Sequence, residues 1–210
     1  MAPRVLSAEF LRTGVRAADW PPGSEPEFAF VGRSNVGKSS MLNALSGRSK
    51  LARVSNTPGR TQALQFFEVA VQGSGTEPVL RVRLTDLPGY GYAKVSKAER
   101  DRWAGMIESY LRERSQLRSV VLIVDGRHPP QPSDHEALAF LRAGGRDVIV
   151  AVTKMDKLTR SQRLPALRRA ERDLGISAGE AVPFSAVEGT GTDALWTRIL
   201  ERARGGAGTS

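Results

Sequence analysis

Short apolar runs alternate with segments of helical periodicity from residue 28 onward, and this alternation constrains the fold more than any other feature. Residues 120–124 and 148–152 are apolar throughout, which is typical of strands buried on both faces of a parallel sheet. Residues 67–71 and 80–84 alternate apolar with polar side chains around a turn-rich stretch, which indicates an antiparallel pair. We therefore expect an α/β domain, with a mostly parallel six-stranded sheet, one antiparallel edge pair and helices on both faces.

The same reading divides the chain into three parts. Residues 1–26, which end in a stretch rich in Pro and Gly, are expected to form an N-terminal extension. Residues 27–204 are the expected folded domain, and residues 205–210 a flexible tail. Within the domain, Ser133 and Glu136 have the spacing of a capping box at a helix start. Pro165 is expected in the first turn of the next helix, because an interior proline costs about 3 kcal/mol.

Composition excludes several classes of protein. The 210 residues include no cysteine, which excludes a disulfide scaffold, a thiolate metal site and a cysteine nucleophile. The longest strongly apolar run, residues 120–124, is far shorter than the ~20 residues of a membrane span. Charged residues near the N-terminus argue against a secretory signal, so we expect a cytoplasmic protein without a membrane partner. The net charge of +9, carried mostly by arginine, fits a polyanionic partner and equally a solubilising surface.

A glycine-containing loop lies between the first expected strand of the domain and the helix that follows it. The pattern GxxxxGK[ST] is matched by Gly32, Arg33, Ser34, Asn35, Val36, Gly37, Lys38 and Ser39. The glycines allow backbone amides to surround phosphate oxygens, and Lys38 neutralises the β and γ phosphates. The Ser39 hydroxyl is suited to ligate Mg²⁺. The loop therefore predicts a nucleoside triphosphate site that uses magnesium.

The choice of base is predicted by residues that follow a buried strand. Residues 153–156 read Thr-Lys-Met-Asp, directly after the strand expected at 148–152. The Asp156 carboxylate can accept hydrogen bonds from N1 and the 2-amino group of guanine, which adenine cannot offer. The Lys154 stem can lie over the base plane, and the Ala186 amide, after the last expected strand, can reach the guanine O6. These residues favour guanine over adenine.

Two polar loops complete the expected site. Residues 86–89 read Asp-Leu-Pro-Gly at the end of a strand, which provides a carboxylate for magnesium through water and a glycine amide for the γ phosphate. The loop of residues 56–62 contains Thr57 and Thr61, which compete as the second protein ligand to Mg²⁺. We favour Thr61, because it adjoins the next expected strand.

Together these motifs resemble the translation-factor-related P-loop GTPases. The strings GRSNVGKSS, PGRTQ, DLPGYGYAKV, DGRHPP and TKMDKL resemble one family among them, the EngB/YihA/YsxC ribosome-biogenesis GTPases, over residues 8–204. The resemblance implies a P-loop GTPase domain, Mg²⁺ held by Ser39 and Thr61, and a role in assembly of the large ribosomal subunit. The nucleotide-binding residues that it implies are Gly32, Arg33, Ser34, Asn35, Val36, Gly37, Lys38, Ser39, Ser40, Gly59, Arg60, Thr61, Gln62, Ala63, Asp86, Leu87, Pro88, Gly89, Thr153, Lys154, Met155, Asp156, Phe184, Ser185 and Ala186. Thr153 stands where GTPases commonly have Asn, although Thr is familiar in this family.

Catalysis is assigned to Lys38 and Asn35. Tyr90 occupies the position where many GTPases have a glutamine that orients water, so we expect slow hydrolysis, on the order of 10⁻⁴ to 10⁻³ per second. Asn35 resembles a residue that in some relatives helps to hold potassium, and a role in stabilising the loop turn is equally open. We expect a monomer that binds GTP, GDP and the large ribosomal subunit or ribosomal RNA, and not DNA. A GTP-dependent binding module with negligible turnover is the alternative, and a P-loop kinase is disfavoured because it would leave Asp156 unexplained.

Overall fold

The computed structural model describes residues 2–48, 51–52, 63–73, 75, 77–90 and 97–205, with the backbone alone for residues 97–103. Its elements in chain order are β1 (Arg4–Gly14), η1 (Ala17–Asp19), β2 (Glu27–Gly32), α1 (Lys38–Leu45), β3 (Leu64–Gln72), β4 (Val79–Asp86), α2 (Lys97–Glu113), β5 (Leu117–Asp125), α3 (Pro132–Ala143), β6 (Val148–Thr153), η2 (Met155–Lys157), α4 (Arg160–Asp173), β7 (Val182–Pro183) and α5 (Thr192–Arg204). Within this part of the chain, no helix is long and apolar enough to cross a membrane.

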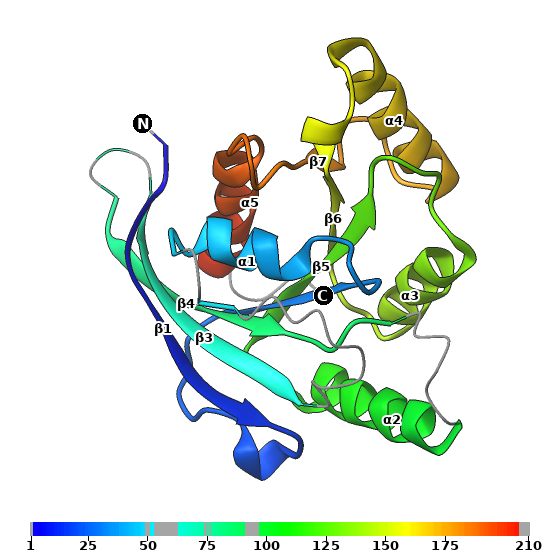
Figure 1. Ribbon diagram of the computed structural model, residues 1–210. Coiled ribbons are helices and arrows are strands. Elements are labelled where there is room, and N and C mark those ends of the chain that lie inside the picture. Colours follow the sequence, from blue (N-terminus) through cyan, green and yellow to red (C-terminus); the bar gives the residue numbers. More distant parts are fainter. Residues whose placement is uncertain are drawn as a thin grey trace.

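The strands form one sheet in the order β1-β3-β4-β2-β5-β6-β7. Strand β2 pairs in parallel with β4 and β5, and β6 pairs in parallel with β5 and β7. Strand β3 is antiparallel to both of its neighbours, β1 and β4. The predicted α/β class, the mostly parallel sheet and the antiparallel pair are confirmed, and Figure 1 shows the helices on both faces of the sheet.

The sheet has seven strands, so the expected count of six was wrong. The additional strand, β1, lies in residues assigned to the N-terminal extension and pairs with β3 along almost its whole length. The register shifts between Val5 and Ser7 and again between Phe10 and Arg12. Such bulges interrupt the regular alternation of side chains between the two faces, so β1 lacks the period-two pattern by which strands are recognised in a sequence.

Alternating side chains of β2 divide the core into two clusters. Phe28 and Phe30 lie in one cluster with residues of α1 and α5, whereas Ala29 and Val31 lie in the other with residues of α2, α3 and α4. All four side chains are nearly or fully buried. A strand buried on both faces reads as a continuous apolar run, which is why β2 and β5 were predictable. The carboxyl ends of the parallel strands are thereby fixed along one edge of the sheet.

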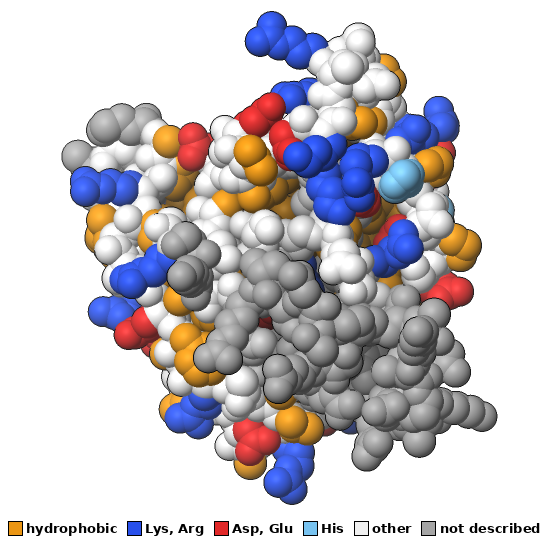
Figure 2. Space-filling view, in the orientation of Figure 1, with side chains coloured by type: hydrophobic (Ala, Val, Ile, Leu, Met, Phe, Trp, Pro, Cys, Tyr) orange, Lys and Arg blue, Asp and Glu red, His pale blue; other side chains and the backbone are white. Residues whose placement is uncertain are grey.

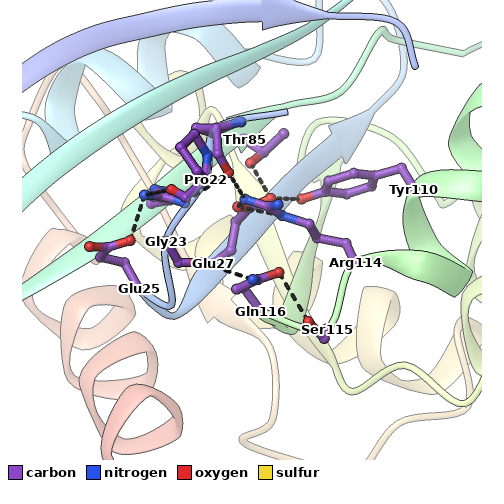
Figure 3. A network of polar contacts seen from close by, with 11 residues as sticks. Pro22, Gly23, Glu25, Glu27, Thr85, Tyr110, Arg114, Ser115 and Gln116 are labelled. Carbon is purple, nitrogen blue, oxygen red and sulfur yellow. Dashed lines mark hydrogen bonds and ion pairs between the residues drawn. The ribbon is translucent and has the colours of Figure 1, made fainter. Parts of the chain in front are cut away.

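A buried polar network fixes the opposite edge (Figure 3). Glu27 is 0% exposed, and its carboxylate accepts hydrogen bonds from Tyr110, from Thr85 at 3.0 Å and from Nε and Nη2 of Arg114 at 3.0 and 2.8 Å. Arg114 Nη2 also donates to the Pro21 carbonyl at 2.9 Å. Burial, together with the neighbouring Glu27 carboxylate, raises the pKa of Tyr110 well above its ordinary value. The network therefore ties the segment before β2 to the end of α2.

Two expectations about helix starts were wrong. Helix α3 is capped by Asp134, whose Oδ2 accepts from the backbone N of Gln131 at 2.8 Å, and not by Ser133 with Glu136. Pro165 is the sixth residue of α4 and so lies beyond its first turn. Both Pro165 and Ser161, whose carbonyl loses its helical partner, are exposed, so water can satisfy that carbonyl.

Candidate functional site

The glycine-containing loop connects β2 to α1, and its backbone conformation explains its glycines. Gly37 has φ +105° and caps the start of α1. A Cβ at Gly32 would lie 2.8 Å from both the Ile123 carbonyl oxygen and Cγ1 of Val36, so no side chain fits there. Asn35 has φ +61°, a left-handed conformation in which Asn is enriched. The loop therefore presents the N-terminus of α1 at the carboxyl edge of the sheet.

Lys38, the first residue of α1, forms an ion pair with Asp86, the last residue of β4. The side chains of Lys38 and Asp86 are only 13% and 8% exposed. Strand β4 is held beside β2, where Phe30 and Asp86 are register partners. The structure thus brings together two predicted site residues that lie 48 positions apart in the sequence.

Thr153 and Lys154 join the end of β6 to the same loop. Oγ1 of Thr153 lies 2.7 Å from the Val36 carbonyl oxygen and 3.0 Å from the Val124 carbonyl oxygen. Lys154 has φ +61°, and its Nζ donates to the Asn35 carbonyl at 2.6 Å. The motif expected to read the base is therefore hydrogen-bonded directly to the loop expected to hold the phosphates.

Asp125, at the end of β5, is a site residue that the sequence analysis missed. It accepts hydrogen bonds from Nζ of Lys154 at 2.9 Å and from the Arg127 guanidinium at 2.8 and 3.0 Å. Burial raises the pKa of Asp125, but these hydrogen bonds outweigh burial and hold its pKa well below the ordinary value. Asp125 is therefore an ionised anchor for Lys154. Its position at the carboxyl end of a central strand is the signal that could have identified it.

Asp156 lies against the residues that follow β7. Its Oδ1 accepts from Oγ of Ser185 at 2.8 Å, and Nζ of Lys157 lies 3.3 Å from its Oδ2. Burial raises the pKa of Asp156, but these contacts outweigh burial and hold its pKa below the ordinary value. The backbone N of Met155 donates to the Phe184 carbonyl at 3.2 Å, which fixes the two segments side by side. Asp156 is therefore an ionised acceptor beside Ser185.

The segment after β4 packs against the loop through Gly89 and Tyr90. A Cβ at Gly89 would lie 3.1 Å from the Gly32 carbonyl oxygen, so the two backbones approach closely. Tyr90 N donates to the Gly32 carbonyl at 3.2 Å, and Ser34 N donates to the Tyr90 carbonyl at 3.1 Å. The Tyr90 hydroxyl donates to Asp134 at 2.9 Å. Burial, together with the Asp134 carboxylate, raises the pKa of Tyr90 far above its ordinary value, so the phenol remains a neutral donor.

Some of the remaining predicted residues lie outside the described part of the chain, and the others differ in how exposed they are. Gly59, Arg60, Thr61 and Gln62 lie outside the described residues, whereas Ala63 directly precedes β3. Leu87, Pro88, Met155 and Phe184 are buried, and Arg33, Ser34, Ser39 and Gly89 are half-buried. Ser40 and Ala186 are exposed. In the part of the chain described, no group of three or more His, Cys, Asp or Glu side chains could hold a metal ion.

Basic side chains lie on the segments that follow β5 and β6 at this edge of the sheet. Figure 2 shows Lys and Arg side chains gathered over the region between α4 and α3 of Figure 1. Arg127 and Lys157 are 42% and 62% exposed, and both belong to segments that follow central strands. A positive surface beside the site attracts anionic ligands.

A strand, a glycine-containing loop and a helix at the carboxyl edge of such a sheet, with a lysine at the helix start, define the class of P-loop nucleotide-binding proteins. The family model described as "50S ribosome-binding GTPase" matches residues 27–154. The protein named "Probable GTP-binding protein EngB" from Anaeromyxobacter sp. (strain Fw109-5) is 64% identical over 203 residues, which are 97% of this chain and 94% of that protein. The chain belongs to the EngB family of GTPases, enzymes that hydrolyse GTP to GDP and phosphate.

Solved structures agree with this family. A crystal structure of a probable GTP-binding protein engB is similar with a TM-score of 0.62 and 26% identity, over 85% of this chain and 99% of that one. The structure of Era in complex with MgGDPNP and nucleotides 1506–1542 of 16S ribosomal RNA is similar with a TM-score of 0.67 and 26% identity. That likeness covers 86% of this chain and 57% of Era. The fold of this chain is therefore that of a GTPase domain.

Proposed function

We propose that this chain is a cytoplasmic, monomeric switch that binds GTP, hydrolyses it slowly and acts in assembly of the bacterial large ribosomal subunit. The observation that carries the proposal is the direct connection between the phosphate loop and the base-reading segment. Thr153 and Lys154 both bind carbonyl oxygens of that loop, and Asp156 stands ionised two residues further on. The description of the matching family model and the RNA bound to Era support a ribosomal RNA partner rather than DNA.

In this proposal the phosphates lie on residues 32–40, with Lys38 beside the β and γ phosphates. Magnesium, when bound, supplies positive charge to the same phosphates. The residues fit a hard cation: Ser39 offers a hydroxyl at the start of α1, and Asp86 offers a nearly buried carboxylate at the end of β4. We assign Ser39 and Thr61 as the protein ligands, and Asp86 as a contact through water. The Lys38–Asp86 ion pair holds both groups at the place where this charge is needed.

Slow hydrolysis follows from the environment of Tyr90. Its hydroxyl donates to Asp134 and its side chain is 9% exposed, so the phenol is occupied by a buried contact with α3. A GTPase without a side chain that orients water relies on Lys38 and the loop amides, and we expect a rate on the order of 10⁻⁴ to 10⁻³ per second. Asn35 is exposed at the turn of the loop, and we propose that its side chain helps to hold a potassium ion that supplies further charge to the transition state.

The competing candidate is a GTP-dependent RNA-binding module with negligible turnover. The two differ in rate, so the test is steady-state phosphate release by the full chain with and without purified large ribosomal subunits. The proposal expects a slow basal rate that rises at least tenfold with subunits, and a rate indistinguishable from uncatalysed hydrolysis in both conditions would favour the module. Lys38→Ala, which removes the charge at the phosphates, is the control for contaminating GTPases.

Co-sedimentation tests the partner and the switch separately. The chain is pelleted with large subunits in a GTP analogue and in GDP over a series of salt concentrations. The proposal expects tighter binding with the analogue and an affinity that falls steeply with salt, because phosphate contacts release counterions. Equal pelleting in the two nucleotides would refute the switch, and a flat salt response would refute the electrostatic contact.

A further inference from the structure

A hollow of about 300 Å³ lies at the edge of the sheet opposite the nucleotide site, where β6 begins. Its charged lining consists of Arg142 in the last turn of α3, Arg146 after α3, Asp147 before β6, Glu180 before β7, and Arg198 and Arg202 on α5. Apolar side chains of α3, β6 and the segment after α4 form its floor. Four guanidinium groups against two carboxylates give the lining an excess of positive charge.

Both carboxylates of the hollow already have partners. Asp147 forms an ion pair with Arg202, and Glu180 accepts from the backbone N of Ser177 at 2.8 Å. Arg198 is held in place by the carbonyls of Gly179, at 2.9 Å, and of Glu180. Two arginines of the lining are therefore fixed to the protein itself, so the hollow keeps its shape before any ligand arrives.

The other two arginines have donors to spare. Within the described part of the chain, Arg142 is exposed and its side chain forms no hydrogen bond or ion pair. Arg146 donates from Nη2 to the Arg112 carbonyl at 3.3 Å, while its Nε is buried without a hydrogen-bond partner. Within the described residues, the guanidinium of Arg142 and the Nη1 of Arg146 are therefore the donors left for a ligand oxygen.

We propose that this hollow binds one nucleotide of a single-stranded RNA segment, with its phosphate on Arg142 and Arg146 and its base against the apolar floor. Planar guanidinium groups bind phosphate with paired hydrogen bonds. A volume of about 300 Å³ is at the lower end for ligand pockets, and it suits a single nucleotide. A base is free to enter only when it is unpaired, which selects single strands. An acidic peptide brings the charge but no planar group to cover the floor.

The inference rests on the RNA partner proposed above, but it makes a distinct claim about nucleotide state. Val148 begins β6 at the hollow, and Thr153 ends β6 at the nucleotide site, so the full length of the strand separates the two places. The hollow is lined by helices and strands outside residues 86–90 and does not include the loop of residues 32–39. Its affinity for RNA is therefore the same with GDP and with a GTP analogue, unlike the nucleotide-dependent contact with the large subunit.

The test measures binding of a fluorescent single-stranded RNA of ten mixed nucleotides to the full chain loaded with GDP. The site variant is Arg142→Gln/Arg146→Gln. The matched control is Arg4→Gln/Arg12→Gln, which removes the same charge from two exposed arginines of β1 whose side chains form no hydrogen bond in the described part of the chain. Arg142→Gln alone is included, because removing the charge of an exposed side chain without hydrogen bonds is expected to leave the fold intact.

We expect the site variant to bind this RNA at least tenfold more weakly, and the control pair to stay within about threefold of the unchanged chain. Loss of the contacts to that one phosphate also lowers the slope of log affinity against log salt by about 0.7, since each phosphate neutralised on a single strand contributes roughly 0.7. Arg142→Gln alone gives about half of that change in slope.

Four results would overturn the inference. Equal weakening by the site variant and the control pair would assign the effect to net charge, and the proposed function would survive. Equally tight binding of free AMP at the hollow would assign it to a small nucleotide. If the site variant lost binding to a polyglutamate peptide while its RNA binding stayed unchanged, the hollow would be assigned to an acidic protein partner. If the unchanged chain bound no RNA at all, this inference and the proposed RNA partner would both be overturned. The GTPase activity would not be affected, because phosphate release tests it separately.

Discussion

The hydroxyl of Tyr90 donates a hydrogen bond to Oδ1 of Asp134 across 2.9 Å. The other carboxylate oxygen of Asp134 accepts from the backbone N of Gln131 at the start of α3. The Tyr90 backbone is in turn hydrogen-bonded to Gly32 and Ser34 of the phosphate loop. A single residue directly after the Asp86–Gly89 motif thus connects the phosphate loop to α3, and this contact makes Tyr90 a positioning residue.

Tyr90→Phe is expected to lower stability and leave hydrolysis nearly unchanged. The substitution deprives a carboxylate that is 3% exposed of one donor, which costs about 1–3 kcal/mol. Urea unfolding monitored by circular dichroism measures that loss, and single-turnover GTP hydrolysis measures the chemistry. A large fall in the hydrolysis rate at unchanged stability would contradict this assignment, because the phenol would then act on the reacting groups.

Thr153→Val is expected to weaken GTP binding about five- to tenfold. Valine has nearly the same shape, but it removes the hydroxyl that bonds the Val36 carbonyl, and a hydrogen bond of this kind contributes about 1 kcal/mol. Thr153→Ser keeps the hydroxyl and serves as the control, with affinity close to that of the unchanged chain. Equal affinities of Thr153→Val and Thr153→Ser in equilibrium titrations with a fluorescent GTP analogue would show that this connection does not matter for binding.

The structure also shows which parts of the site were predictable. Asp86 and Asp156 were predictable because each lies within a few residues of the end of an expected strand, and the carboxyl ends of parallel strands meet at one edge. The contact of Tyr90 with Asp134 joins residues 44 positions apart, and the contact of Lys154 with Asp125 joins residues 29 positions apart. Neither contact leaves a local pattern, because each depends on how helices and strands pack. Strand β1 was missed for a different reason. The alternation of side chains that marks a strand is a local sequence pattern, but in β1 two bulges interrupt it.

Asn35 provides the test of potassium. Because its φ is +61°, alanine would strain the loop, so Asn35→Gly is the cleaner way to remove the side chain. We expect hydrolysis by the unchanged chain to be faster in potassium than in sodium at equal ionic strength, and Asn35→Gly to abolish the difference. Asn35→Asp, which keeps a side-chain oxygen, should retain it. Equal rates of the unchanged chain in the two salts would remove potassium from the mechanism.

Glu27→Gln tests the buried network at the other edge of the sheet. It leaves the nearly buried Arg114 guanidinium without its counter-charge, and loss of one partner of a buried pair costs about 3–5 kcal/mol. Glu68→Gln is the matched control, since it breaks a pair whose arginine, Arg81, is 63% exposed, and surface pairs contribute about 1 kcal/mol or less. Denaturant midpoints of both variants decide the matter. Similar midpoints would mean that the network contributes little to stability.

The central claim is that Asp156 reads guanine, and exchange of its carboxylate for an amide tests it most directly. Asn at this position still offers Ser185 an acceptor, so Asp156→Asn is expected to fold. It presents a donor to the guanine N1 hydrogen, and such a mismatch in a site built for hydrogen bonds is worth about 10⁴ in discrimination. The measurement is the affinity of the unchanged chain and of Asp156→Asn for GTP and for xanthosine triphosphate, whose 2-oxygen accepts from the new amide. We predict that the variant loses GTP and gains xanthosine triphosphate, and unchanged GTP affinity in the variant would contradict the account.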